Sequence, residues 1–179
     1  MLRIESVSDI ELNATISAAL AAPTVDKVEL VSVRPDWIEL CVPGDLQAVA
    51  TAEQMLAPTL AGLPPETREA VAIVFRELLE NAIEHGCRLE RSKIIEVSFV
   101  RLKRAVVCRI KDPGAGFDPA RLAHAAVNNP DDDPLRHARV REESGMRAGG
   151  FGLLLTTKLV DELVYNEQHN EVLFVKFLP

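Results

Sequence analysis

The clearest periodic pattern in the chain lies between a proline pair, Pro64–Pro65, and Gly86. Apolar side chains recur there at the 3.6-residue spacing of one helix face, at Val71, Val74, Phe75, Leu78 and Ala82. Proline suits the first helical position, and glycine commonly follows the last one. The pattern therefore predicts one helix of about six turns with a single buried face.

Alternation of apolar and polar residues with a period of two marks the strands. It predicts strands over residues 37–42, 93–100, 105–111, 164–167 and 171–177, together with an extended piece at 28–33. The third of these predicted strands follows the second after a short polar turn, so the two are expected to form a hairpin. The last two are expected to form a closing hairpin around residues 168–170.

Two further helices are predicted, one over residues 46–60 and one after Gly152. The positions expected to be buried in the first are Leu46, Val49, Ala50, Leu56 and Leu60. The positions expected to reach the core after Gly152 are Leu153, Leu154, Thr157, Leu159, Val160 and Leu163. The order of elements predicts an α/β fold, a two-layer α/β sandwich whose mixed, mostly antiparallel sheet carries helices on one face.

The length of 179 residues suits one domain. We expect residues 1–35 to be an N-terminal extension, with a helix near residues 10–21, and residues 36–179 to be the domain itself. Residues 118–149 are rich first in Asn, Asp and Pro and then in arginine. Because this polar segment separates two glycine-rich turns, we expect it to form a lid over a site.

Charge and cysteine content narrow the class of protein. The formal net charge of −7 argues against direct binding of a nucleic-acid backbone, and the only candidate basic patch is the run 136–147. Three cysteines without paired spacing favour core thiols in a reducing compartment, and Cys108 alternates with apolar strand neighbours. No apolar run reaches the ~18 residues of a membrane span. These features predict a cytoplasmic protein with no membrane partner.

The predicted helix over residues 65–86 carries acids where a helix disfavours them. Glu77, Glu80 and Glu84 lie near its C-terminal end, which bears partial negative charge. Glu77 and Asn81 are four residues apart, so their side chains lie on one face, away from the apolar stripe. A carboxylate beside an amide oxygen suits a hard cation such as Mg²⁺ and the activation of a nucleophile. The alternative is a solvated helix face.

Two glycine-rich turns follow downstream, Asp112-Pro-Gly114-Ala-Gly116 and Gly149-Gly150-Phe-Gly152. The first can be an ordinary β-turn. The second opens a predicted helix, whose free amides can bind phosphate oxygens. Neither a Gly-x-x-x-x-Gly-Lys motif nor a His-Glu-x-x-His motif is present, so the common alternative phosphate and zinc sites are excluded.

The helix motif and the two glycine turns together resemble the N box and the glycine boxes of the gyrase, chaperone, histidine-kinase and mismatch-repair (GHKL) ATPases. Within that superfamily the chain is similar to the anti-sigma-factor serine/threonine kinases, over residues 36–178. The resemblance implies the fold that the element order predicts. It implies ATP and Mg²⁺ as cofactors, Glu77 as the general base and Asn81 as the Mg²⁺ ligand. The segments before residue 36 and between residues 117 and 149 depart from the pattern that can be aligned.

The same resemblance assigns nucleotide-binding roles. Asp112 would accept a hydrogen bond from the exocyclic amine of adenine, which favours ATP over GTP. The remaining positions expected to bind nucleotide are Gly114, Gly116, Arg147, Gly150, Gly152 and Leu153, with Arg147 as the best placed arginine of the lid. Glu80 and Glu84 are expected to be solvated or paired, and His85 to cap the helix end or pair with acids rather than to catalyse.

The expected activity is therefore that of an ATP-dependent protein serine/threonine kinase. Its expected partners are an anti-anti-sigma factor, as the serine-bearing substrate, and a sigma factor, and a homodimer is compatible with the resemblance. The alternative is an ATP-gated protein-binding module of the same fold, in which a general base such as Glu77 would have no purpose. A histidine-kinase catalytic half is a second alternative, but residues 1–35 contain no phosphoacceptor histidine.

Overall fold

The computed structural model describes residues 27–34, 36–117, 129–130, 132–145 and 150–179. The described strands are β1 Glu29–Arg34, β2 Trp37–Pro43, β3 Ile94–Arg101, β4 Ala105–Lys111, β5 Glu162–Tyr165 and β6 Glu171–Phe177. The described helices are α2 Ala48–Leu60, α3 Pro65–Asn81 with its continuation η1 Ala82–Gly86, α4 Arg136–Glu143 and α5 Gly152–Leu159. The predicted helix near residues 10–21 lies outside the described residues, as does much of the predicted lid.

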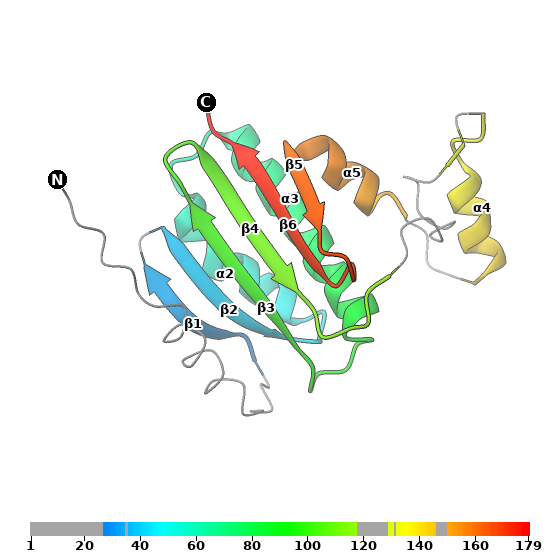
Figure 1. The fold of residues 1–179 in the computed structure, drawn as a ribbon, viewed down its shortest axis with the longest axis horizontal. Coiled ribbons are helices and arrows are strands. Elements are labelled where there is room, and N and C mark those ends of the chain that lie inside the picture. The colour runs from blue at the N-terminus through cyan, green and yellow to red at the C-terminus, as the bar shows by residue number, and fades with distance from the viewer. Residues whose placement is uncertain (1–26, 35, 118–128, 131, 146–149) are drawn as a thin grey trace.

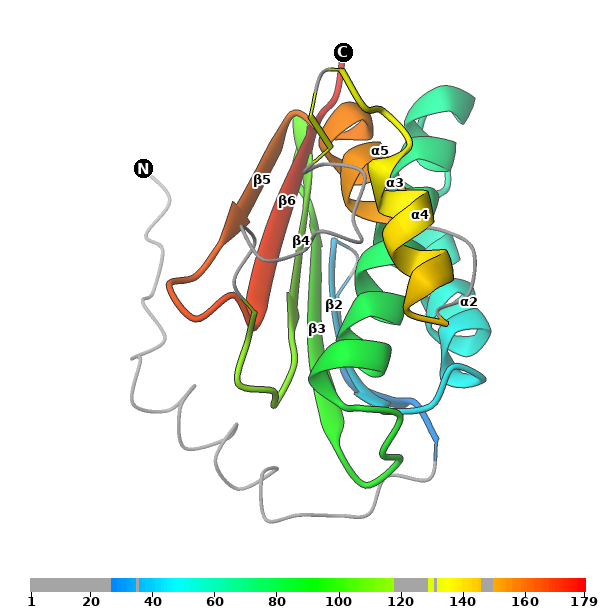
Figure 2. The ribbon, with the colours of Figure 1, turned by 90° about the vertical axis from the view of Figure 1, so that its right-hand side faces the viewer.

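The six described strands form one sheet in the order β1-β2-β3-β4-β6-β5 (Figure 1). All five pairings between them are antiparallel, so the parallel part of the predicted mixed sheet is not found among the described strands. Helices α2, α3 and α5 lie on the same face of the sheet (Figure 2). The predicted two-layer α/β sandwich is confirmed.

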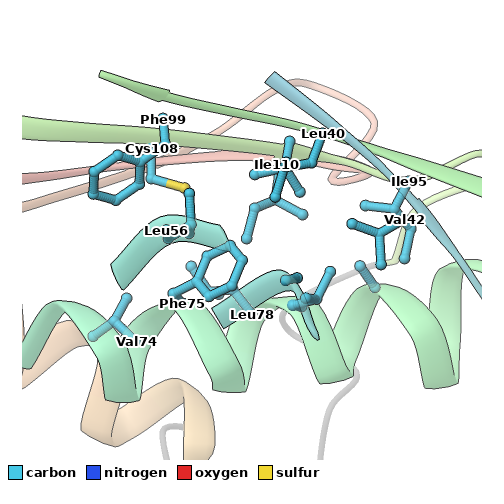
Figure 3. Close-up of a cluster of buried hydrophobic side chains, with 14 of the residues drawn as sticks. Leu40, Val42, Leu56, Val74, Phe75, Leu78, Ile95, Phe99, Cys108 and Ile110 are labelled. Atoms are coloured by element: carbon cyan, nitrogen blue, oxygen red, sulfur yellow. The ribbon is translucent and has the colours of Figure 1, made fainter. Parts of the chain in front are cut away.

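The core lies between the sheet and these helices. Its fully buried strand residues include Leu40, Phe99 and Cys108, which alternate with less buried neighbours as the period-2 pattern requires. Opposite them, Val74, Phe75 and Leu78 point from α3 toward the sheet (Figure 3). The apolar stripe predicted for this helix is thus its core face. The other side of α3 therefore faces away from the sheet.

The predicted start of the first helix was wrong. Leu46 lies in the turn before α2 and its side chain is 39% exposed, while Ala50 faces solvent. The chain turns first because the Asp45 carboxylate accepts a hydrogen bond from the Gln47 backbone N–H at 3.0 Å. Helix α2 then begins at Ala48, and the buried positions of its first two turns become Ala48, Val49 and Ala52.

Two assignments near the end of the chain are also corrected. Thr157 is exposed, and its neighbour Thr156 is the buried residue, with its hydroxyl donating to the Gly152 carbonyl at 2.8 Å. The sequence of α5 is apolar on most sides, so its pattern did not define one face. Strand β5 lies two residues earlier than predicted. It ends at Tyr165 because residues 166–170 close as a turn, in which the His169 N–H donates to the Asn166 carbonyl at 3.0 Å.

Candidate functional site

One cavity of about 590 Å³ lies beside the end of α3 and extends to the first residues of α5 and to β4 and β6. Its volume falls in the range of small-ligand sites. Both glycine turns and the Glu77/Asn81 motif contribute to its walls. Segments as far apart in the sequence as Glu77 and Val172 therefore meet at one place.

Glu77 and Asn81 lie on the last two turns of α3, and both side chains are partly buried in the cavity wall. They occupy one face, as their spacing predicts. The Glu77 carboxylate reaches the first residue of α5: a side chain at Gly152 would collide with the Glu77 Oε2 atom. A carboxylate at a helix N-terminus is favourably placed against the helix dipole. Glycine at position 152 therefore allows the acid to approach the second glycine turn.

The helix does not continue as a regular α-helix to Gly86. Residues Ala82–Gly86 form a π turn, in which the Cys87 N–H donates to the Ala82 carbonyl, five residues earlier, at 2.8 Å. The predicted single regular helix of six turns is corrected here to an α-helix that ends in a π turn. Such wide turns are frequent at functional sites because they redirect side chains within a helix. Here the wide turn presents Gly86 and the exposed His85 to the cavity.

Gly86 and Asp112 are in direct contact. A β-carbon at Gly86 would overlap the Asp112 side chain, so glycine at this position leaves the space that the carboxyl group occupies. Sequence reasoning identified Gly86 only as the end of a helix. The contact joins two segments that are 26 residues apart, and a local sequence pattern carries no signal for it.

Asp112 follows the end of β4 and lines the cavity. Burial raises the pKa of its carboxyl group, and a hydrogen bond from the Gly114 N–H to Oδ1 at 2.8 Å partly offsets that rise. Its own N–H donates to the Asn170 carbonyl at 2.9 Å. The bond to Oδ1 thus orients the side chain at the cavity wall.

Gly116 requires glycine for two reasons. Its backbone has φ of 78°, and a side chain would overlap the carbonyl oxygen of Gln168. Phe117, the next residue, packs edge-on against Tyr165 with ring centroids 5.6 Å apart. Tyr165 and His169 stack at 5.6 Å, and both line the cavity. Sequence reasoning missed this aromatic group, which no motif marked.

Gly150, Gly152 and Leu153 all line the cavity, and Gly150 has φ of 92°. Gly152 and Leu153 are the first two residues of α5, so their backbone N–H groups are among those that have no partner within the helix. Gly149 lies outside the described residues. Gly114 lies behind Asp112, close to the Gly86 backbone, rather than in the cavity wall.

Arg147 lies outside the described residues, so its predicted role stays a prediction. The arginine that lines the cavity in the described part of the chain is Arg141, on α4. Helix α4 falls within the predicted lid and was not anticipated. Its His137 is fully buried and packs edge-on against Phe151, with ring centroids 4.3 Å apart.

The negative charge of the acidic side chains in the cavity limits which ligands it can bind. Five carboxylate residues line it, namely Glu77, Glu80, Glu84, Asp112 and Glu171, against Arg141 and two histidines. A polyphosphate would be repelled here unless a cation accompanied it. Among the described residues, no three His, Cys, Asp or Glu side chains gather as a metal cage. Mg²⁺ rarely uses such a cage and prefers one or two protein oxygens plus phosphates, so the donors present fit it.

Residues 42–176 match the family described as the histidine kinase-like ATPase domain. The chain is also similar to the serine-protein kinase RsbW of Oceanobacillus iheyensis, with 25% identity over 142 residues that cover 78% of this chain and 85% of the relative. In the described part of the chain, no helix has the length and apolar character needed to cross a bilayer. The two matches confirm the resemblance predicted from the motifs, and the chain belongs to the histidine kinase-like ATPase domain family.

Proposed function

We propose that this protein is an ATP-dependent protein serine/threonine kinase that phosphorylates an anti-anti-sigma factor and binds a sigma factor. The observation that carries the proposal is the position of Glu77, whose carboxylate lies against the start of α5 in the cavity that Asp112 also lines. The similarity to a serine-protein kinase supports the reaction. The protein would act in the cytoplasm, as a monomer or as a homodimer. Residues 36–179 would form its catalytic domain.

The nucleotide would extend along α3 and η1. Asp112, beside Gly86, would accept a hydrogen bond from the adenine amine through its carboxylate. The phosphates would lie nine residues back along the helix, roughly 13 Å away, at the amides of Gly152 and Leu153. Arg141 lines the same cavity and would add positive charge to the phosphate end, a role that Arg147 could share.

Glu77 would act as the general base. The serine hydroxyl oxygen of the partner attacks the γ-phosphorus of ATP, the bond from that phosphorus to the β,γ-bridging oxygen breaks, and ADP leaves. The hydroxyl proton passes to the Glu77 carboxylate. Phosphoryl transfer depends mainly on positioning and on electrostatics, so this proton transfer would supply only part of the acceleration.

Asn81 would hold Mg²⁺ through its amide oxygen, one turn from Glu77 and on the same helix face. The neutral ligand matters because a second carboxylate at this position would add to the negative charge of the cavity. The bound ion would neutralise charge on the phosphates.

The proposal is tested by the Glu77→Gln variant, which keeps the size of the side chain and one oxygen. ATP affinity should change little, whereas single-turnover transfer to a serine-bearing anti-anti-sigma partner should fall by about 10² to 10⁴-fold. The matched control is Glu69→Gln, an exposed acid on the same helix outside the cavity. The product should survive acid, as a serine ester does and a phosphohistidine does not.

Two results would contradict the proposal. Transfer at the parental rate by the Glu77→Gln variant would show that Glu77 is not the base. ATP binding without transfer to any serine-bearing partner would favour a nucleotide-gated binding module of the same fold.

A further inference from the structure

The turn between β5 and β6, residues 166–170, lies directly against the first glycine turn, more than 50 residues away in the sequence. Figure 1 shows this turn beside the end of β4, where Lys111 pairs with Glu171. The Asp112 N–H donates to the Asn170 carbonyl at 2.9 Å, and the Gly116 backbone lies so close to the Gln168 carbonyl that a side chain at Gly116 would overlap it. The two turns therefore form one packed unit.

The side chain of Asn170 binds the backbone of the first glycine turn. Its Nδ2 donates to the Gly114 carbonyl at 3.1 Å and lies 3.4 Å from the Asp112 carbonyl. Because carbonyl oxygens only accept, the amide nitrogen must face the glycine turn. The Oδ1 atom then accepts from Asn166 Nδ2 at 2.8 Å, which fixes the amide from its other side.

The backbone of Gly114 is consequently held on both sides of its α-carbon. Its N–H donates to Asp112 Oδ1 at 2.8 Å, and its carbonyl accepts from Asn170. A shift of the Gly114 backbone would move the donor that orients the Asp112 carboxylate. The Phe117 ring adds a further contact between the two turns, because its centroid lies 5.5 Å from that of the His169 ring.

We propose that Asn170 is a positioning residue for base recognition, which sets the ATP-over-GTP preference by fixing Gly114 and, through it, the Asp112 carboxylate. The inference rests on the proposed function, since it takes Asp112 as the group that reads adenine. Asn170 itself need not contact the nucleotide. Its contribution should appear in the discrimination between bases, and the phosphate end of the cavity should not depend on it.

The test compares Asn170→Ala with the parent for binding of Mg-ATP, Mg-GTP and Mg-tripolyphosphate, measured by calorimetry. Loss of two hydrogen bonds to the turn should weaken ATP binding about tenfold and reduce the ATP-to-GTP preference by a similar factor. Affinity for tripolyphosphate, which has no base, should stay at the parental value. Gln168→Ala is the matched control, because it removes an exposed side chain from the same turn and keeps the backbone carbonyl near Gly116.

Asn170→Asp provides a second variant of nearly equal volume. It keeps the acceptor for Asn166, replaces the donor to the Asp112 and Gly114 carbonyls by an oxygen, and adds a negative charge. The added charge should weaken the binding of all three ligands alike, whereas the lost donor should reduce the ATP-to-GTP preference as in Asn170→Ala. Equal loss of affinity for all three ligands in Asn170→Ala would show that Asn170 only stabilises the hairpin. An unchanged ATP-to-GTP preference in both variants would show that Asn170 has no role in recognition.

The failure of this inference can be separated from failure of the proposed function. If the parent shows no adenine preference, or if Asp112→Asn leaves that preference unchanged, the role of Asp112 is wrong and the role of Asn170 falls with it. If the preference depends on Asp112 but neither Asn170 variant alters it, only the inference is overturned.

Discussion

In the proposed site, the Asp112 carboxyl group would couple base recognition to pH. Burial raises its pKa above the ordinary value of 3.8, so the folded protein holds this proton more tightly than the unfolded chain does. The stabilisation from that proton is complete below pH 3.8 and is lost as the pH rises through the raised pKa. At neutral pH the ionised group lowers the stability of the empty protein, and in the proposed site the same charge helps to bind adenine.

We predict that Asp112→Asn moves stability and affinity in opposite directions. At neutral pH, thermal unfolding of the empty variant should occur at a higher temperature than in the parent. ATP binding should weaken about fivefold or more, because one amide oxygen must serve both the Gly114 N–H and the adenine amine, without the charge-assisted part of the bond.

The pH dependence of the same comparison is the sharper measurement. The ratio of parental to variant ATP affinity should be largest at neutral pH and should approach one as the pH falls through the raised pKa of Asp112. Titration of the ATP phosphates affects both proteins alike and cancels in the ratio. A ratio that stays constant as the pH falls from 8 to 3.8, the ordinary pKa of the group, would show that the charge of Asp112 plays no part in binding.

Residues within one element could be assigned from the sequence, and residues that meet across elements could not. Glu77 and Asn81 share a face because a helix repeats every 3.6 residues, and the structure places both in the cavity. Asn170 and Gly86 touch the first glycine turn only because β6 pairs with β4 and η1 ends beside β4. Such contacts depend on tertiary packing, for which a single sequence holds no periodic signal.

At the scale of elements, strands were predicted more closely than helix details. Strands β2, β3, β4 and β6 lie within one residue of their predicted bounds, because antiparallel strands with one buried face alternate strictly. The π turn at Ala82–Gly86 escaped prediction, since its five-residue bonding leaves the apolar pattern upstream unchanged. Helix α5 was placed correctly, but its buried threonine was not, because apolar residues surround the helix.

His137 of helix α4 packs against the second glycine turn. Its ring packs against Phe151, and Asn129 holds it from the other side, with Oδ1 accepting from the His137 N–H at 2.9 Å and Nδ2 lying 2.7 Å from Nδ1. An Nδ1 that accepts places the ring proton on Nε2, which is buried and has no partner among the described residues. The packing of this side chain therefore couples α4 to the wall of the cavity.

We predict that His137→Ala releases α4 from the domain. Loss of a buried ring and of its aromatic contact should cost at least about 1.4 kcal/mol of local stability, which raises the population of the open state about tenfold. Tryptic cleavage at the arginines of α4 should accelerate by a similar factor, while the melting temperature of the domain changes little. Leu135→Ala, an exposed position just before the helix, is the control. Equal cleavage rates in the parent and in His137→Ala would exclude this attachment.

For the whole molecule, the acidic cavity and the net charge of −7 lead us to expect that nucleotide binding depends on a cation. We predict that Mg-ATP raises the melting temperature and that ATP with a chelator raises it much less. At a hundred times the dissociation constant a ligand adds about 2.7 kcal/mol, or about 5 to 10 °C for a chain of this size. An unchanged melting curve at millimolar Mg-ATP would contradict the nucleotide site as a whole.

The Asn81→Ala variant measures how much of that stabilisation depends on Mg²⁺ binding at Asn81. The variant should keep the shift produced by ATP with a chelator and lose most of the additional shift produced by Mg²⁺, because it lacks the amide oxygen that is proposed to hold the ion. Gln54→Ala, an exposed amide on α2, should behave as the parent does. If Asn81→Ala keeps the full Mg²⁺-dependent shift in melting temperature, the ion has other ligands and Asn81 is only a residue of the cavity wall. If the variant loses the shift that ATP produces in the presence of a chelator, Asn81 contacts the nucleotide itself.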